Sequence, residues 1–129
     1  MSDSNSLNIL LVEDDDALLL FFSRALRRAG HSVETCARGD DGLNLALSGR
    51  FDLLVLDWRL PGLDGHAVLS GVRAAGRSLP VLMLTGYGDT HREFAMAAGA
   101  NAFIEKPCGL EELVAAAEKF PKQTVPCAA

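Results

Sequence analysis

The sequence predicts an α/β protein built on an open, doubly wound parallel sheet. Two observations carry this prediction. Five short apolar runs alternate along the chain with amphipathic stretches, and four of those runs are hydrophobic at nearly every position. Strands that are buried on both faces of a parallel sheet have this composition. A repeated strand-then-helix order gives right-handed crossovers that cover both faces, and there are too few units here to close a barrel.

The expected strands are the five apolar runs, and the second of them alternates in polarity, as a strand at the edge of a sheet does. They span Asn8–Val12, Ser32–Cys36, Leu53–Leu56, Val81–Leu84 and Ala102–Ile104. The expected helices carry apolar residues at helical spacing between these runs. They span Ala17–Ala29, Asp40–Ser48, Asp64–Ala75, Asp89–Ala98 and Leu110–Phe120.

Capping and stop signals support each expected helix. The first helix follows an aspartate cluster in which Asp15 and Asp16 can serve as caps, and Asp64 is expected to cap the third. Glycine or proline marks every helix end, as is typical of helix termination. These residues are Gly30, Gly49, Gly76, Gly99 and Pro121. The fourth helix is rich in alanine and has few large anchors beyond Phe94 and Met96, so it is expected to be weakly anchored and able to shift.

Length and composition predict one ordinary globular domain. The chain has 129 residues and a net charge of −5, which makes it a poor nonspecific binder of nucleic acid or of an anionic membrane. No apolar run is long enough to cross a bilayer, and residues 1–8 lack the basic start of a signal peptide. We therefore expect a cytoplasmic protein with a disordered tail over residues 1–7, a domain over 8–120 and a tail or linker over 121–129.

Cysteines and histidines are not expected to form a site. The number of cysteines is odd and none has C-x-x-C spacing, which fits neither a disulfide framework nor a zinc site. They are Cys36, Cys108 and Cys127. The histidines are expected at the surface. They are His31, His66 and His91.

Polar residues follow four of the expected strands, at the edge where open α/β sheets bind their ligands. Carboxylates follow the first and third strands as Glu13, Asp14 and Asp57, while Thr85 and Lys106 follow the fourth and fifth. Carboxylate oxygens favour a hard divalent ion such as Mg²⁺, and a hydroxyl and an ammonium can hold an anion. This combination suits phosphoryl transfer, in which a carboxylate can be the nucleophile.

Residues Ile9–Phe120 resemble the receiver domain of two-component response regulators. The likeness rests on four segments that stand in the right order at the strand ends, namely ILLVEDD, LLVLDWRLPGLDG, LMLTGYG and FIEKP. It implies a flavodoxin-like (βα)5 three-layer sandwich with parallel strand order 2-1-3-4-5. It also implies a phosphoacceptor signalling domain, not a conventional enzyme, that controls an output through its fourth helix, fifth strand and fifth helix.

The resemblance implies a role for each residue of the expected site. Asp57 would accept the phosphoryl group, Thr85 would hydrogen-bond it, and Lys106 would pair with its charge. Asp14 would bind Mg²⁺ directly and Glu13 mainly through a water molecule. The full set of ligands implied for Mg²⁺, which Mn²⁺ would be able to replace, is Glu13, Asp14, Asp57 and the backbone carbonyl of Arg59.

The resemblance also extends to the surroundings of the site. Thr85 and Phe103 would be switch residues, and the Lys106–Pro107 peptide bond would be cis. Small and large residues near the site would set access to the phosphoryl group, and two of them are bulky, which predicts a long-lived phosphoryl state. These positions are Arg59, Gly86 and Tyr87.

The implied partners are a sensor histidine kinase or phosphotransfer protein as donor and a downstream effector domain or protein, with phosphorylation-dependent homodimers frequent in the family. Neither nucleic acid nor a membrane is an expected partner of this chain. A flavin or nucleotide binder would need a phosphate-binding loop where the sequence has EDDD. An aspartate phosphatase would need a second acid where Arg59 stands. A pseudo-receiver that only binds a partner protein stays open as an alternative.

Overall fold

A parallel sheet of five strands lies at the centre of the molecule, in the predicted order β2-β1-β3-β4-β5. The computed structural model describes residues 6–86, 88–106 and 108–122, apart from the side chains of residues 88–92. The strands are β1 (Asn8–Val12), β2 (Ser32–Cys36), β3 (Leu53–Asp57), β4 (Val81–Thr85) and β5 (Ala102–Glu105). Asp57 and Thr85 are therefore the last residues of their strands, just beyond the predicted ends.

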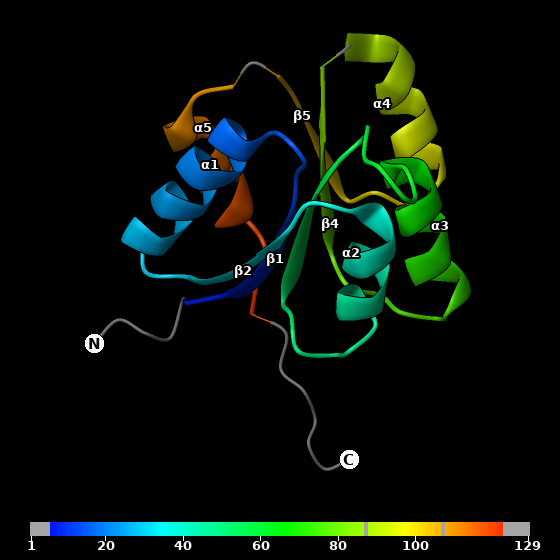
Figure 1. Cartoon of the computed structure of the whole chain (residues 1–129), viewed down its shortest axis with the longest axis horizontal. Helices are drawn as coiled ribbons and strands as arrows, with labels where there is room; N and C mark the ends of the chain where they lie inside the picture. The colour runs from blue at the N-terminus through cyan, green and yellow to red at the C-terminus, as the bar shows by residue number, and fades with distance from the viewer. Residues whose placement is uncertain (1–5, 87, 107, 123–129) are drawn as a thin grey trace.

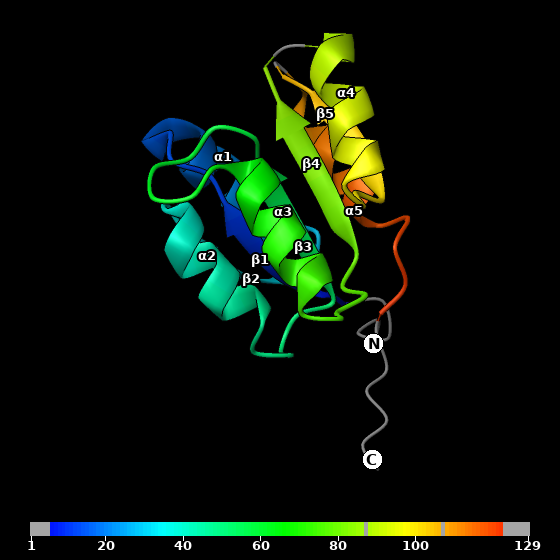
Figure 2. The same ribbon diagram turned by 90° about the vertical axis from the view of Figure 1, so that its right-hand side faces the viewer.

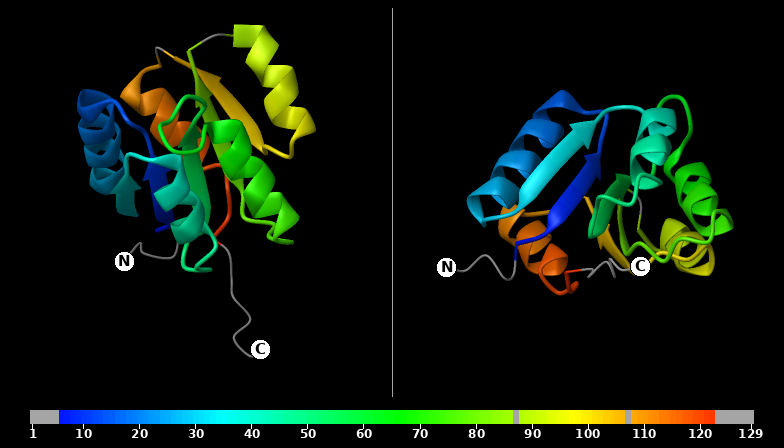
Figure 3. Two further views of the ribbon diagram at one scale, coloured as in Figure 1. Left: turned by 45° about the vertical axis from the view of Figure 1, so that its right-hand side comes forward. Right: turned by 90° about the horizontal axis from the view of Figure 1, so that it is seen from below.

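Helices cover both faces of this sheet. They are α1 (Asp16–Arg28), α2 (Gly39–Ala46), α3 (Gly65–Ala74), α4 (Gly88–Ala97) and α5 (Leu110–Ala117). Figures 1, 2 and 3 show α1 and α5 on one face and α2, α3 and α4 on the other. This is the predicted three-layer, flavodoxin-like arrangement, and α2, α3 and α5 are somewhat shorter than predicted. None of the helices in the described part of the chain has the length and apolarity needed to span a membrane.

The core has two halves because successive strand residues point to opposite faces. In β1, Leu10 packs toward α2, α3 and α4, while Ile9 packs toward α1 and α5. The prediction that Phe94 and Met96 anchor α4 is wrong, since their exposed fractions are 60% and 44%. Ala95, which is fully buried between them, makes the contact with the core instead.

Two aspartates cap helices as predicted. The Asp15 side chain accepts a hydrogen bond from the Leu18 N–H at 3.0 Å, and Asp64 accepts one from the Ala67 N–H at 2.9 Å. Such caps satisfy N–H groups that have no partner within the helix. Because Asp15 caps α1, the neighbouring Asp14 is available for another task.

Apart from His31, the histidines and cysteines form no cluster among the described residues. His66 is exposed, as predicted, and Cys36 and Cys108 are free thiols. The side chain of His91 and the whole of Cys127 lie outside the described residues.

His31 is buried, which corrects the prediction that it lies at the surface. Its side chain is only 2% exposed, and its Nδ1 accepts a hydrogen bond from the Leu7 N–H at 3.0 Å. A backbone N–H can only donate, so a neutral ring carries its proton on Nε2, which lies 2.9 Å from Oε2 of Glu118. Leu7 directly precedes β1 and Glu118 directly follows α5. Both are far from His31 in sequence, so no local pattern revealed them.

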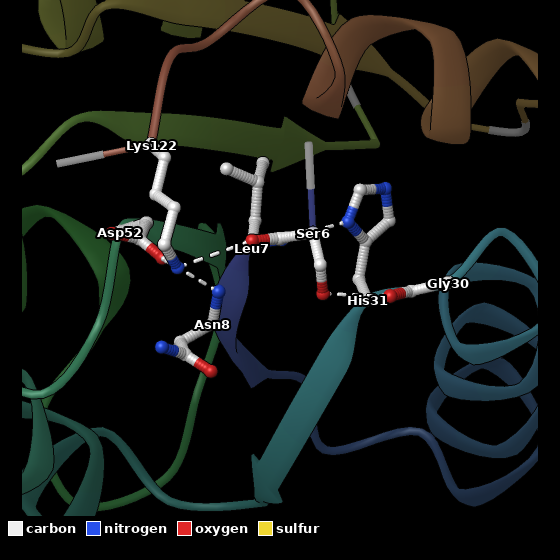
Figure 4. A network of polar contacts seen from close by, with 7 residues as sticks. All are labelled: Ser6, Leu7, Asn8, Gly30, His31, Asp52 and Lys122. Carbon is white, nitrogen blue, oxygen red and sulfur yellow. Dashed lines mark hydrogen bonds and ion pairs between the residues drawn. The ribbon is translucent and has the colours of Figure 1, made fainter. Parts of the chain in front are cut away.

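His31 belongs to a group of polar contacts that joins both ends of the described chain to the start of the sheet (Figure 4). We call this group the basal network. It comprises the residues labelled in Figure 4, namely Ser6, Leu7, Asn8, Gly30, His31, Asp52 and Lys122, together with Glu118. The buried Asp52 carboxylate accepts a hydrogen bond from the Asn8 N–H at 2.7 Å and lies 3.5 Å from Nζ of Lys122. Lys122 also donates to the Ser6 carbonyl at 3.2 Å. The network therefore fixes the segment after α5 against β1, β2 and β3.

Replacing His31 with alanine should destabilise the domain. The change leaves the buried Leu7 N–H without its acceptor and removes a packed side chain, so we expect the free energy of unfolding to fall by about 2–3 kcal/mol. Urea denaturation followed by far-UV circular dichroism measures this loss. His66→Ala is the matched control: it is at an exposed position, removes only a tilted ring contact with Trp58 and should change stability by less than about 1 kcal/mol. Equal stabilities of the two variants would contradict the structural role of His31.

Candidate functional site

The registers of four strands bring the predicted site residues to one edge of the sheet. β1 and β3 end in register, so Glu13 and Asp57 become neighbours just past the last paired residues. In β4, Thr85 comes directly after the residue that pairs with Asp57. The partner of Thr85 in β5 is followed at once by Lys106. Asp57 and Thr85 thus end the buried strands β3 and β4, while Glu13 and Lys106 directly follow the last residues of β1 and β5.

Three carboxylates form the acidic part of the site. Glu13, Asp14 and Asp57 each offer an oxygen, and these oxygens all lie within 4.8 Å of one another. Glu13 is fully buried and Asp57 is 5% exposed, whereas Asp14 is exposed to solvent. An all-oxygen set of this kind, with one open side, suits a hard cation that keeps some of its water ligands.

The Lys106 ammonium bridges two of the acids. Its Nζ lies 3.1 Å from Oε1 of Glu13 and 3.2 Å from Oδ1 of Asp57. The backbone N–H of Lys106 donates to the Thr85 carbonyl at 2.6 Å, which continues the β4–β5 ladder to the edge of the site. The carboxylates therefore hold Lys106 facing the site.

The crowding of charges shifts the pKa values of both members of this pair. Burial and repulsion by Glu13 raise the pKa of Asp57 from its ordinary value of 3.8 to about 6, although Lys106 opposes the change. Burial of the Lys106 ammonium lowers its pKa, but Asp57 and Glu13 outweigh burial and raise it overall. With three carboxylates and one ammonium, the ionised cluster has an excess of two negative charges. A divalent cation would neutralise this excess.

A pocket of about 330 Å³ opens at this edge of the sheet. Its lining includes seven of the predicted site residues, namely Glu13, Asp14, Asp57, Arg59, Thr85, Gly86 and Lys106. Thr85 is fully buried and Arg59 is exposed. The structure thus assembles the acids, the hydroxyl and the ammonium around one cavity.

Other predicted residues lie elsewhere. Phe103 does not line this pocket but is half-buried in β5 against the core half beneath α2, α3 and α4. Tyr87, Pro107 and the predicted cis peptide bond lie outside the described residues. Sequence reasoning also missed Trp58, which lines the pocket and whose ring centroid is 5.8 Å from that of His66. Its position directly after Asp57 was the only available signal.

The comparisons with a family model and with curated proteins agree on one protein family. Residues 9–118 match the family described as response regulator receiver domain. Response regulator MprA of Mycobacterium bovis is 38% identical over 122 residues, which cover 94% of this chain and 53% of that protein. Transcriptional regulatory protein AfsQ1 of Streptomyces coelicolor is 41% identical over 101 residues, covering 78% and 44%. The chain therefore spans about half the length of these curated relatives.

Several solved structures are similar to this chain both in fold and in sequence. The receiver domain of sensor histidine kinase PA1611 from Pseudomonas aeruginosa has a TM-score of 0.81 and 32% identity, over 89% of this chain and 97% of that one. That structure is described as having a magnesium ion coordinated in the active site cleft. Chemotaxis response regulator CheY4 of Vibrio cholerae has a TM-score of 0.82 and 29% identity, over 88% and 98%.

The chain belongs to the response regulator receiver domain family. It is a phosphoacceptor signalling module of two-component systems and not a conventional enzyme. The prediction from the sequence motifs is thereby confirmed, and the acidic cluster of Glu13, Asp14 and Asp57 is present in the structure.

Proposed function

We propose that Asp57 accepts a phosphoryl group from the phosphohistidine of a sensor kinase or phosphotransfer protein. A carboxylate oxygen of Asp57 forms a bond to phosphorus while the P–N bond breaks, and the imidazole of the donor keeps the electron pair. The observation that carries this proposal is the place of Asp57, a buried strand-end carboxylate that lines an open pocket with Lys106 at 3.2 Å. A carboxylate nucleophile gives an acyl phosphate.

We propose that Mg²⁺ is held by Glu13, Asp14, Asp57 and the backbone carbonyl of Arg59. The excess negative charge of the cluster and its all-oxygen donors support this assignment. The ion supplies positive charge that stabilises the oxygens of the transferring group. Mn²⁺ is expected to substitute, because carboxylate and carbonyl ligands suit it as well. Without a cation, the crowded carboxylates would repel an incoming phosphoryl group.

We propose that Lys106 and Thr85 bind the phosphoryl group non-covalently once it is attached to Asp57. The Lys106 ammonium already faces Asp57 and would pair with the new charge, while the Thr85 hydroxyl would donate to a phosphoryl oxygen. Phosphorylation adds up to about two negative charges at a buried position. A movement of Thr85 toward this charge would repack the surface formed by α4, β5 and α5, with Phe103 following it.

The output of this change is also a proposal. Phe94 and Met96 are exposed on α4, which gives an effector domain, an effector protein or a second phosphorylated copy an apolar surface to contact. We propose that the receiver domain spans residues 8–120, which the family match over 9–118 supports. A cytoplasmic location stays a prediction.

Mass spectrometry of the intact chain tests the proposal. Incubation with Mg²⁺ and a small acyl phosphate should add one phosphoryl group, and a chelator should prevent the addition. Borohydride reduction of an aspartyl phosphate gives homoserine, which peptide mapping should place at position 57. If Mg²⁺ binds but neither acyl phosphate nor any phosphorylated kinase gives an adduct, the chain is a pseudo-receiver that only binds proteins.

Arg59 is expected to prolong the life of the phosphorylated form. It is an exposed, bulky side chain that lines the pocket, where it can obstruct the water that attacks phosphorus. Arg59→Ala should therefore lose its phosphoryl group several-fold faster in a time course of intact masses. Arg24→Ala, farther along α1 at a position that does not line the pocket, is the control and should match the unaltered chain. Equal decay of both variants would contradict this role.

A further inference from the structure

The loop that follows Asp57 is fastened at its tip to the first turn of α2. The backbone N–H of Gly39, the first residue of α2, donates to the Pro61 carbonyl at 2.9 Å. N–H groups at a helix start have no partner within the helix, and the N-cap residue Arg38 provides no side-chain cap here. The Pro61 carbonyl therefore caps the start of α2, and the same hydrogen bond fixes the position of the loop.

Position 39 has room for glycine alone. An ideal Cβ at Gly39 would lie 1.7 Å from the carbonyl oxygen of Leu63 and 2.7 Å from its carbonyl carbon, whereas real Cβ atoms almost never approach within 3.0 Å. The obstruction is backbone, so no change of rotamer relieves it. Any larger residue at this position must push the loop away from α2.

The loop has little slack to absorb such a push, because its other end is closed onto Asp57. The Gly65 N–H donates to the Trp58 carbonyl at 2.7 Å. An ideal Cβ at Gly65 would lie 2.2 Å from the Asp57 carbonyl oxygen, so this end is also tightly packed. Arg59 lies between the two attachments. A displacement of the loop at Leu63 would therefore also move the backbone of Arg59.

We infer that Gly39 is a positioning residue for the Mg²⁺ site. Through its contacts with Pro61 and Leu63, it holds the loop in the conformation that presents the Arg59 carbonyl to the ion. This inference rests on the proposed function, in which that carbonyl is a ligand. The edge strand β2 contributes no acid to the pocket, yet the turn after it would set the affinity of the pocket for metal.

A pair of glycine substitutions in α2 tests the inference. Gly39→Ala pushes on the loop, whereas Gly42→Ala, in the same helix, meets the Val12 side chain at 2.9 Å and leaves the loop alone. Mg²⁺ titration followed by fluorescence of Trp58, the only tryptophan of the chain, gives the dissociation constant. We expect Gly39→Ala to weaken Mg²⁺ binding by about tenfold or more, as loss of an outer support of a metal site does. Gly42→Ala should stay within about twofold of the unaltered chain, well below that effect.

Two further measurements separate the possible failures. If Asp14→Asn binds Mg²⁺ as the unaltered chain does, the proposed metal site is wrong. If Asp14→Asn loses binding but Gly39→Ala and Gly42→Ala bind equally, only the positioning inference is overturned. Should Gly39→Ala not fold, amide hydrogen exchange of the unaltered chain decides, because coupling between two sites is reciprocal. Mg²⁺ should slow exchange of the Gly39 amide more than that of the Gly42 amide, and equal slowing would overturn the inference.

Discussion

Asp57→Asn is expected to abolish phosphorylation while leaving the fold intact. The amide keeps nearly the same shape and can still accept a hydrogen bond from Lys106, which lies 3.2 Å from Oδ1 in the unaltered chain. It lacks the anionic oxygen that attacks phosphorus, so no acyl phosphate can form. Intact mass after incubation with Mg²⁺ and a small acyl phosphate should show no adduct.

Asp16→Asn is the matched control for this variant. Asp16 is an exposed acid in the first turn of α1 and does not line the pocket, so its variant should be phosphorylated like the unaltered chain. Persistence of the adduct in Asp57→Asn would place the acceptor at another carboxylate, with Asp14 the first to examine. Loss of the adduct in both variants would indicate a general effect of charge near the pocket.

The same Asp57→Asn variant should be more stable than the unaltered chain at neutral pH without Mg²⁺. Burial and Glu13 raise the pKa of Asp57 from 3.8 to about 6, so the folded state binds this proton more tightly than the unfolded state. A raised carboxyl pKa stabilises the fold below pH 4, and that contribution is lost as the pH rises through 6. At pH 7 the ionised carboxylate therefore costs up to about 3 kcal/mol, which asparagine removes.

Chemical denaturation between pH 4 and pH 7 in the presence of a chelator measures this difference. The advantage of Asp57→Asn should be largest near pH 7 and should shrink to less than about 1 kcal/mol near pH 4. Saturating Mg²⁺ should also reduce it at pH 7, because an ion that binds only the folded acidic site stabilises the unaltered chain. A stability difference that does not change with pH would contradict the raised pKa of Asp57.

Much of the fold follows from local patterns in the sequence. Unbroken apolar runs identify buried strands, aspartates and glycines mark the helix ends, and parallel topology brings the strand ends together. Asp57, Thr85 and Lys106 could therefore be assigned to one site from the sequence alone, since each directly ends or follows such a run. A strand that is buried on both faces leaves few alternatives for the polar residue that ends it.

Other features depend on partners that are distant in sequence, and local patterns could not reveal them. His31 has a polar side chain at the start of a strand, and only the approach of Leu7 and Glu118 allows its burial. The large side chains of α4 suggested an anchor, yet its small Ala95 is the residue that faces the core. The contact between Gly39 and Leu63 likewise arises only when α2 packs beside the loop after β3.

The basal network has a practical consequence for experiments that attach the protein to something else. It brings the side-chain Nζ of Lys122 within 3.2 Å of the Ser6 carbonyl, at the edge of the sheet where the strands begin. The acidic pocket lies where the strands end, on the opposite side of the molecule. If a biotin or fluorophore were attached before Ser6 or after Lys122, it would lie on the side opposite the pocket. A protein immobilised on a sensor through such a label would keep its pocket facing bulk solvent. The same proximity makes the domain suitable for circular permutation, with a short linker joining the two ends.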